Sequence, residues 1–320
     1  MRSYLHCCGL GAIKKKECSE AFHHAQRCGE GVQCRVMWYL VITSLIWSFS
    51  FGVINANLTG LDPFLVSWIR LTLSFLVFAP FIKRAPLHRV FWLMLIGAVQ
   101  FGLMYCLYIY SYQYLAGHEV ALWTITTPLF MVFLAGMLDR SWRLSWWFSA
   151  VLAVIAALLL RMNGADFQAS LMGVLLVQGA NLCFAAGQLL YKRLAFDKGF
   201  HHFAWLYLGA LLVPAIAMAF SGFSVSMPQG SAQWLSLLYV GLIPSGLGFF
   251  LWNTGVSKVS SGTAAVMNNL KIPLGVFVAF AVFGEAIHWP GFVGSAILLA
   301  VAVWLTGFDG IGKNKPVKSA

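Results

Sequence analysis

Charged residues are scarce in this chain. Only 10% of its 320 residues are Asp, Glu, Lys or Arg, whereas 60% are hydrophobic. A water-soluble domain needs a far more charged surface, so the composition excludes an ordinary soluble fold. Lipid must therefore form part of the solvent of this protein.

Catalytic and ATP-binding motifs are also missing. The apolar stretches contain no HExxH, no GxSxG and no pair of carboxylates, so we expect no enzyme, no catalytic residue and no cofactor. No Walker motif is present, so we expect no ATP hydrolysis by this chain, and nothing in the sequence indicates an ATPase subunit as a partner.

Cysteine is rare outside the first 36 residues, which hold five of the seven cysteines. This segment has no CxxC with a partnered CxxC or HxxxH, so we expect no metal site, and it lacks the apolar core of a secretory signal. We interpret residues 1–36 as a disordered cytoplasmic extension or as an upstream start assignment, with Met37 opening the protein proper. Cys106 and Cys183 lie in apolar stretches and are expected to be packing residues.

Long apolar stretches are what the chain does have. A spanning helix needs about 20 mainly apolar residues, because it crosses about 30 Å of hydrocarbon. The lengths of these stretches and their Leu, Ala, Val and Phe content indicate helices rather than barrel strands. We predict an all-α membrane protein with ten transmembrane helices, at residues 37–56, 64–82, 90–115, 119–138, 144–160, 170–191, 203–221, 234–255, 263–284 and 290–308.

Positive charge falls on one side of the predicted membrane. With the N-terminus inside, the opposite loops carry only Arg161, whereas the cytoplasmic connections carry Lys83, Arg84, Arg89, Arg140, Arg143, Lys192, Arg193, Lys198 and Lys258. Because cytoplasmic loops concentrate Lys and Arg, we expect both termini, including the basic tail 309–320, to be cytoplasmic. The net charge of +11 thus reflects the orientation of the chain in the membrane. We expect the protein to contact membrane lipid and to bind no nucleic acid.

The two halves of the predicted bundle correspond in sequence. Gly117 and Pro128 match Gly262 and Pro273 at an offset of 145 residues. A duplicated unit with an odd number of helices must insert its second copy in the opposite orientation. We therefore predict two inverted five-helix repeats with substrate near the midplane between them and alternating access around it. The predicted repeats are residues 37–161 and 170–308.

Buried charge marks the expected site. Arg70 and Lys271 lie inside the second and ninth predicted helices, where a cation costs about 2.5 to 3.5 kcal/mol. Acids at that depth are scarce, so the two cations imply a cavity for an anion, most simply a carboxylate. The alternative is that both side chains snorkel to the membrane surface. Pro128 and Pro273 are predicted to break the helices that carry the neighbouring polar residues.

Amides and aromatic rings complete the predicted lining. A few convergent polar groups in an apolar pocket are typical of small-molecule sites. Helix packing and interfacial anchoring are the alternatives for such residues. The candidates are Asn268, Asn269, Asn253, Asn181, Gln178, Trp47 and Trp252.

Several longer motifs carry a family resemblance. They are WSFSF at 47–51, LLVQGANLCFA at 175–185, YKRL at 191–194, FAWLYLGA at 203–210, LWNTG at 251–255, MNN at 267–269 with a following IP, and HWP at 288–290. From Met37 on, the chain resembles the EamA family of the drug/metabolite transporter superfamily, and within it the biotin transporters of the carboxylate/amino acid/amine transporter group. The resemblance implies two EamA repeats, a bacterial inner-membrane location and import of biotin.

This resemblance gives the candidate residues specific roles. Biotin, or a similar carboxylate, is the expected substrate. Arg70 or Lys271 would neutralise its carboxylate, the amides would bond its ureido group, and Trp47 and Trp252 would pack on its fused rings. The alternative function is export of amino acids, amines or other small metabolites, although a cation exporter is expected to have an intramembrane Asp or Glu.

Overall fold

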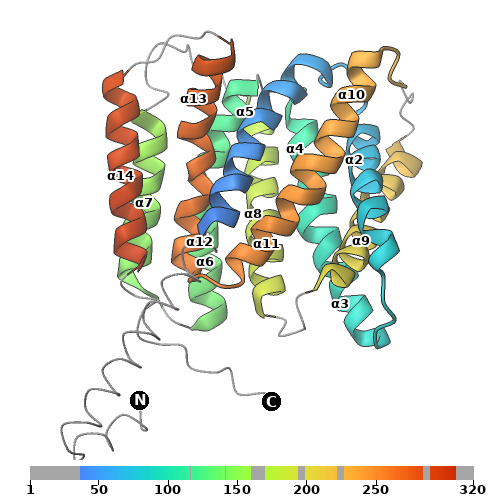
Figure 1. The fold of residues 1–320 in the computed structure, drawn as a ribbon, viewed down its shortest axis with the longest axis horizontal. Coiled ribbons are helices and arrows are strands. Elements are labelled where there is room, and N and C mark those ends of the chain that lie inside the picture. The colour runs from blue at the N-terminus through green and yellow to red at the C-terminus, as the bar shows by residue number, and fades with distance from the viewer. Residues whose placement is uncertain are drawn as a thin grey trace, which may run out of the picture.

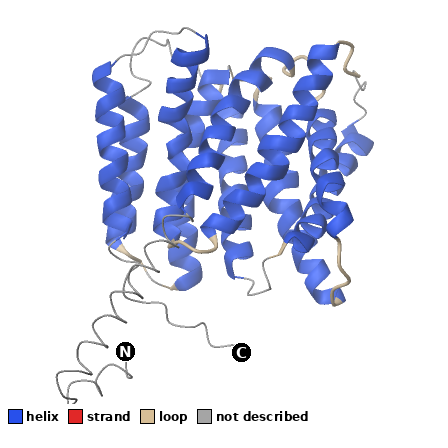
Figure 2. Ribbon diagram, viewed as in Figure 1, coloured by secondary structure: helices blue, strands red, loops and turns tan. Residues whose placement is uncertain are grey.

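The apolar stretches form upright helices in the computed structural model, which describes residues 37–115, 117–140, 142–159, 170–193, 199–221, 227–283 and 289–307. Figure 1 shows these helices standing side by side with connections at both ends of the bundle, and Figure 2 shows helix and loop only over the described part. The predicted extension 1–36 and the tail 309–320 lie outside the described residues.

The helices follow one another without a strand between them in the described ranges. The first runs from Met37 to Asn57. It is followed by α2 (Pro63–Phe78), η2 (Ala79–Phe81), α3 (Leu87–Gly97), η3 (Ala98–Leu103), α4 (Met104–Ser111), α5 (Gly117–Trp123), η4 (Thr124–Thr126), α6 (Thr127–Asp139), α7 (Leu144–Leu159), α8 (Leu171–Arg193), α9 (Phe200–Ser221), α10 (Ser231–Val240), η5 (Gly241–Gly248), α11 (Phe249–Val256), α12 (Ser261–Met267), η6 (Asn268–Leu270), α13 (Lys271–Phe283) and α14 (Trp289–Gly307).

Eight of the described helices are long and apolar enough to cross a membrane. The two remaining predicted spans correspond to α7, a shorter apolar helix, and to the unbroken helical stretch α12–η6–α13. The described helices are therefore consistent with ten crossings.

The third predicted span, 90–115, has the least accurate boundaries. The structure starts this helix at Leu87, directly after Pro86, and ends it at Ser111, beyond which the chain turns. Hydropathy alone misplaced both ends, because Tyr112–Leu115 are apolar enough to extend a window yet must turn the chain toward α5. At the other end, His88 and Arg89 can extend a helix into the polar membrane surface.

Irregular helix turns occur at matching places in the two halves. The third and the eighth spans each contain a π segment, η3 and η5, and the fourth and ninth each contain a 3₁₀ turn, η4 and η6. Each 3₁₀ turn directly precedes the helix that carries the predicted proline, Pro128 in α6 or Pro273 in α13. A proline near the start of a helix loses no essential hydrogen bond, so the break falls before it.

Helices of the two halves pack against one another as matched pairs. Thus α2 lies against α9, and α7 lies against α14. Two glycines allow the third span to approach α9 and the eighth span to approach α2. A Cβ on Gly97 would lie 1.8 Å from the carbonyl oxygen of Leu206, and one on Gly241 would lie 2.8 Å from Leu73 Cδ1. Small residues permit such close helix contacts in membranes, where hydrophobicity alone does not hold helices together.

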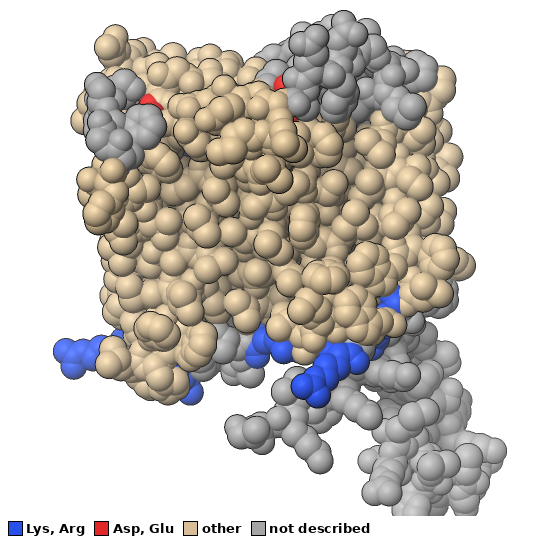
Figure 3. All heavy atoms as spheres, turned by 180° about the vertical axis from the view of Figure 1, so that it is seen from behind, with Lys and Arg blue, Asp and Glu red and all other residues tan. Residues whose placement is uncertain are grey.

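Basic side chains gather at one end of the bundle, which we call the basic end (Figure 3). The described Lys and Arg that are exposed are Lys83, Arg84, Arg89, Arg140, Arg193 and Lys258. Helix α8 finishes at this end with Arg193, whereas the first helix starts here, where Lys258 lies over the Tyr39 ring with its Nζ 5.8 Å from the centroid. The helices that begin the two halves therefore run in opposite directions, as an inverted repeat requires.

Candidate functional site

A cavity lies between the two halves, with about 580 Å³ of empty space when its open mouth is included. The first helix, α2, α4, η4, α6, α8, η5, α11 and α13 all contribute to its wall, so it involves both repeats. Its lining is Trp47, Ser50, Phe51, Ile54, Arg70, Met104, Tyr105, Tyr108, Thr124, Thr127, Ala180, Asn181, Phe184, Pro244, Phe249 and Lys271.

The cavity extends from the middle of the bundle toward the end opposite the basic end. In the first helix, which begins at the basic end, the lining residues start only at Trp47. In α2, which runs toward the basic end, Arg70 lies in the earlier half of the helix. Between the cavity and the basic end the bundle is packed, with Leu40, Val256 and Met267 buried in the core.

Arg70 is held in the cavity wall by a serine and a tyrosine. Its side chain is 1% exposed, so it does not snorkel to a surface. Its Nε donates to Ser245 Oγ at 3.2 Å, and its guanidinium carbon lies 4.1 Å from the centre of the Tyr105 ring. Nη1 has no hydrogen-bond partner. A buried donor without a partner costs about 1 to 3 kcal/mol, so an acceptor in the cavity would stabilise this arrangement.

Lys271 is the second cation in the same wall, and it too is buried, at 8% exposure. Its Nζ is 3.5 Å from Asn268 Oδ1 and 5.7 Å from the centre of the Trp47 ring, close enough for a cation–π contact. No ion pair involves either cation in the described part of the chain, and the pair of Arg193 with Asp139 lies at the basic end. The described structure thus gives neither cavity cation a carboxylate.

Three hydroxyl groups in the wall are oriented as acceptors. Ser50 and Thr124 donate to carbonyls of their own spans at 2.8 and 2.7 Å, and Thr127 shares its proton between the Thr124 carbonyl at 2.6 Å and Asn181 Oδ1 at 3.0 Å. A hydroxyl has one proton and two lone pairs, so oxygens that have committed the proton can still accept. This part of the cavity suits a ligand with N–H donors.

Asn181 and Gln178 form a network with η4 and the start of α6. Asn181 Nδ2 donates to the Trp123 carbonyl at 2.9 Å, and its Oδ1 accepts from Thr127 at 3.0 Å. Gln178 Oε1 accepts from Thr126 at 2.7 Å. Of the two amides, Asn181 lines the cavity and Gln178 does not. Their hydrogen bonds join α8 of the second half to η4 and the start of α6 in the first half.

Four further predicted residues lie outside the cavity wall. Trp252 packs behind Trp47, with ring centres 5.0 Å apart, and Asn253 Oδ1 accepts from Gln100 Nε2 at 3.0 Å. Asn268 contacts Lys271, and Asn269 donates to the Ile125 and Ala153 carbonyls at 2.9 and 3.2 Å. Of the predicted set, the structure brings Arg70, Lys271, Trp47 and Asn181 together around the cavity.

Ser245 is a functional candidate that the sequence did not single out. It is fully buried in η5, directly after Pro244, and contacts both Arg70 and Tyr105. A Pro-Ser-Gly run inside an apolar span was the available signal, because proline and glycine in a membrane helix mark an irregular backbone. That the run lies opposite Arg70 depends on helix packing.

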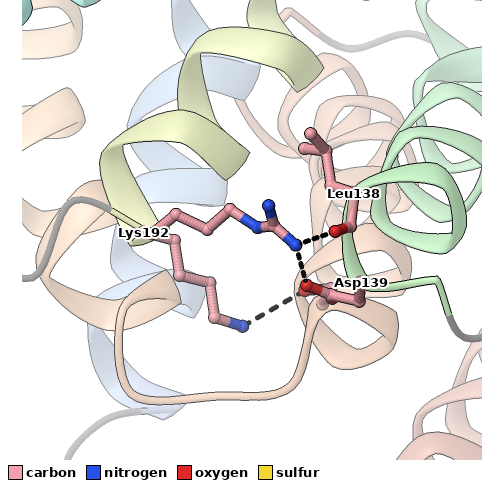
Figure 4. A network of polar contacts seen from close by, with 5 residues as sticks. Leu138, Asp139 and Lys192 are labelled. Atoms are coloured by element: carbon pink, nitrogen blue, oxygen red, sulfur yellow. Dashed lines mark hydrogen bonds and ion pairs between the residues drawn. The ribbon is translucent and has the colours of Figure 1, made fainter. Parts of the chain in front are cut away.

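The basic end is closed by polar contacts between helices. Arg193 at the end of α8 donates to the carboxylate of Asp139 and to the carbonyl of Leu138, both at the end of α6 (Figure 4). Lys192 donates to the Val259 carbonyl at 2.6 Å, between α11 and α12. The Arg193 contacts link α6 of the first half to α8 of the second, whereas the Lys192 contact lies within the second half.

Two successive stretches of the chain, residues 35–162 and 171–307, match the model of the EamA-like transporter family. The chain belongs to this family. It contains two EamA repeats and is a multi-pass membrane protein, as predicted.

Individual relatives support this membership. The chain is 38% identical to a biotin transporter of Escherichia coli K12 and 35% identical to a probable biotin transporter of Pseudomonas aeruginosa. Each alignment covers 84% of this chain, with 92% of the first relative and 96% of the second. A solved crystal structure has the same fold, with a TM-score of 0.70 at 16% identity over 89% of this chain and 99% of that one.

Proposed function

We propose that this EamA family protein transports biotin across the bacterial inner membrane into the cell. The observation that carries the proposal is the cavity between the repeats, in which Arg70 and Lys271 lie buried without a described carboxylate partner. An anionic ligand supplies the missing charge. The biotin transporters among the relatives make biotin, a carboxylate with an apolar fused ring and a ureido group, the best match.

The chemistry of the wall gives biotin an orientation. The planar fork of Arg70 suits a carboxylate better than the point charge of a lysine does, so Arg70 binds the carboxylate and Lys271 adds positive potential. The hydroxyl oxygens of Ser50, Thr124 and Thr127 accept from the ureido N–H groups. Trp47 and Phe249, whose rings lie 5.0 Å apart, form the apolar wall for the fused rings.

The position of the cavity supports an outward-facing state in a cycle of alternating access. Because Lys and Arg concentrate on the cytoplasmic side, the basic end faces the cytoplasm, and so do both termini. The cavity then faces outward, and the contacts of Arg193 and Lys192 close the inner side. Rocking of one repeat against the other would open the inner side and close the outer side, which is alternating access.

Uptake of labelled biotin tests the proposal directly. Cells that cannot make biotin are given nanomolar biotin with this gene or with an empty vector, and membrane expression is verified in both. We expect uptake and growth only with the gene. Absent uptake from a protein that is present in the membrane would refute the biotin assignment.

An exporter of amino acids or amines is the alternative function. The described spans hold two buried cations and no buried acid beside the cavity, which favours an anionic substrate over an amine. Cells preloaded with labelled amino acids distinguish the two functions. Faster efflux with the gene, together with unchanged biotin uptake, would support the exporter.

A further inference from the structure

The π segment η5 is anchored by side chains from three other spans. A π segment that contains a proline leaves carbonyl groups without their usual α-helical donors, and these groups need other partners in a membrane. The structure provides them at four of the eight residues. Trp47 Nε1 donates to the Pro244 carbonyl at 3.1 Å, Ser74 to Gly241 at 2.8 Å, Thr43 to Gly248 at 3.3 Å, and Tyr207 to Ser245.

This anchoring fixes the position of Ser245 opposite Arg70. The Ser245 carbonyl accepts a hydrogen bond from the Tyr207 hydroxyl of α9. The Ser245 hydroxyl oxygen accepts a second one from Arg70 Nε at 3.2 Å. The Tyr105 hydroxyl lies 3.0 Å from the same oxygen, and its ring lies under the guanidinium. All four side chains are at most 5% exposed, so these contacts lie in a largely desolvated part of the wall.

The contact uses one particular atom of the guanidinium. Arg70 donates a hydrogen bond to Ser245 through its Nε, while its Nη1 has no hydrogen-bond partner. A carboxylate that binds an arginine through two parallel hydrogen bonds needs two N–H groups in a fixed plane. A guanidinium held by Nε and by a ring face cannot rotate about its long side chain, so less conformational entropy is lost when the ligand binds.

We infer that Ser245, together with Tyr105, is a positioning residue for carboxylate recognition: it holds Arg70 so that its Nη groups meet the substrate carboxylate. This inference rests on the proposed function. The inference goes beyond the proposed function because it assigns the two repeats different tasks. The first repeat would bind the carboxylate through Arg70, and the second would orient Arg70 through Ser245 of η5. Neither Ser245 nor Tyr105 needs to touch the carboxylate.

The test compares a charged ligand with a neutral one. Purified protein in lipid nanodiscs is titrated with biotin and with its uncharged carboxamide. For Ser245→Ala we expect about tenfold weaker biotin binding, the loss of one hydrogen bond to a charged group, with carboxamide binding changed less than about twofold. Tyr105→Phe keeps the ring and removes the hydroxyl, so we expect a loss of about threefold, again for biotin alone.

Two further variants separate positioning from general damage. Ser149→Ala removes an equally buried serine hydroxyl in α7, where it donates to its own helix at Ser145, and should change neither ligand. In an Arg70→Gln background, Ser245→Ala should add no further loss of biotin binding, because its effect passes through the guanidinium.

Three results would overturn the inference. They are equal weakening of biotin and carboxamide in Ser245→Ala, unchanged biotin binding in that variant, or a full additional loss in the Arg70→Gln background. If Ser245→Ala does not yield folded protein, Tyr105→Phe provides the test, again by comparing its loss of biotin binding with its loss of carboxamide binding. If the wild-type protein binds no biotin, the proposed function itself is refuted. This outcome is distinct from failure of the inference, because it is seen before any variant is compared.

Discussion

The two repeats share a backbone but differ in chemistry. Both place a π segment in their third span and a 3₁₀ turn in their fourth. Tyr105 and Phe249, which are 144 residues apart, both line the cavity, and so do Thr127 and Lys271, the first residues of α6 and α13. The duplicated backbone therefore places corresponding positions of both repeats in one cavity wall.

Charge is distributed unequally on this shared backbone. Helix α6 of the first repeat begins with Thr127, whereas α13 of the second begins with Lys271. Gly241 packs against α2 near the Arg70 carbonyl, and its counterpart Gly97 packs against α9 at the carbonyl of Leu206, an apolar residue. The two repeats thus contribute different side chains to the one cavity wall.

Removing the first repeat's cation should have the largest effect. Arg70→Gln eliminates the charge and the two-pronged donor, and we expect biotin uptake to fall by about a hundredfold or more, since hydrogen bonds to charged groups contribute about 1.5 to 3 kcal/mol each. Initial uptake rates over a range of biotin concentrations measure the loss. Arg84→Gln, at the exposed basic end, is the matched control and should transport normally. Normal uptake by Arg70→Gln would remove Arg70 from the site.

The two corresponding glycines should differ in stability when replaced. A methyl group on Gly97 meets the backbone carbonyl of Leu206 at 1.8 Å, which cannot rotate away, whereas on Gly241 it meets the Leu73 side chain at 2.8 Å, which can. Overpacking costs about 1 to 3 kcal/mol, so we expect Gly97→Ala near the upper value and Gly241→Ala near the lower. Thermal unfolding of both purified variants ranks them. A less stable Gly241→Ala would contradict the structure of these contacts.

Making the second repeat resemble the first should weaken transport moderately. Lys271→Thr puts the residue of position 127 at position 271 and removes one of two positive charges from the cavity. We expect KM for biotin to rise by about tenfold, because the charge acts on the ligand without the bidentate geometry of Arg70. Lys258→Thr, which removes a lysine charge at the exposed basic end, is the matched control. An unchanged KM in Lys271→Thr would exclude Lys271 from ligand binding.

Breaking the contact between repeats at the basic end should have the smallest effect. Arg193 and Asp139 are each 42% exposed, and exposed ion pairs contribute about 0 to 1 kcal/mol. We expect Asp139→Asn to leave KM unchanged and to alter the maximal uptake rate by less than about threefold. Kinetics in cells with matched expression provide the measurement. A tenfold change in KM would show that this contact influences the outer cavity more strongly than its exposure suggests.

Much of the fold could be predicted from the sequence because its causes are local. Apolar length locates the helices, loop Lys and Arg indicate their direction, and Pro128 and Pro273 mark where two of them change pitch. Arg70 and Lys271 could be identified as site candidates because an intramembrane cation is costly wherever it faces. The third span was placed a few residues too late, since hydropathy does not register a turn among apolar residues.

The partners of the other polar residues could not be predicted in the same way. Asn269 and Asn253 looked as suitable as Asn181 for a ligand, but Asn269 bonds two backbone carbonyls and Asn253 bonds Gln100. Trp252 packs behind Trp47 instead of lining the cavity. Lipid and core are both apolar, so the sequence of a membrane helix does not reveal which face turns inward.

By itself, the sequence determined that this is a duplicated, helical membrane protein with two cations inside the bilayer, because those properties depend on composition, length and charge along one chain. The tertiary structure decided which side chains share the cavity and how Arg70 is held. Ser245 lies 175 residues from Arg70, and only the packing of η5 against α2 brings the two together. Contacts of that kind depend on the rotation and depth of whole helices, which no local pattern specifies.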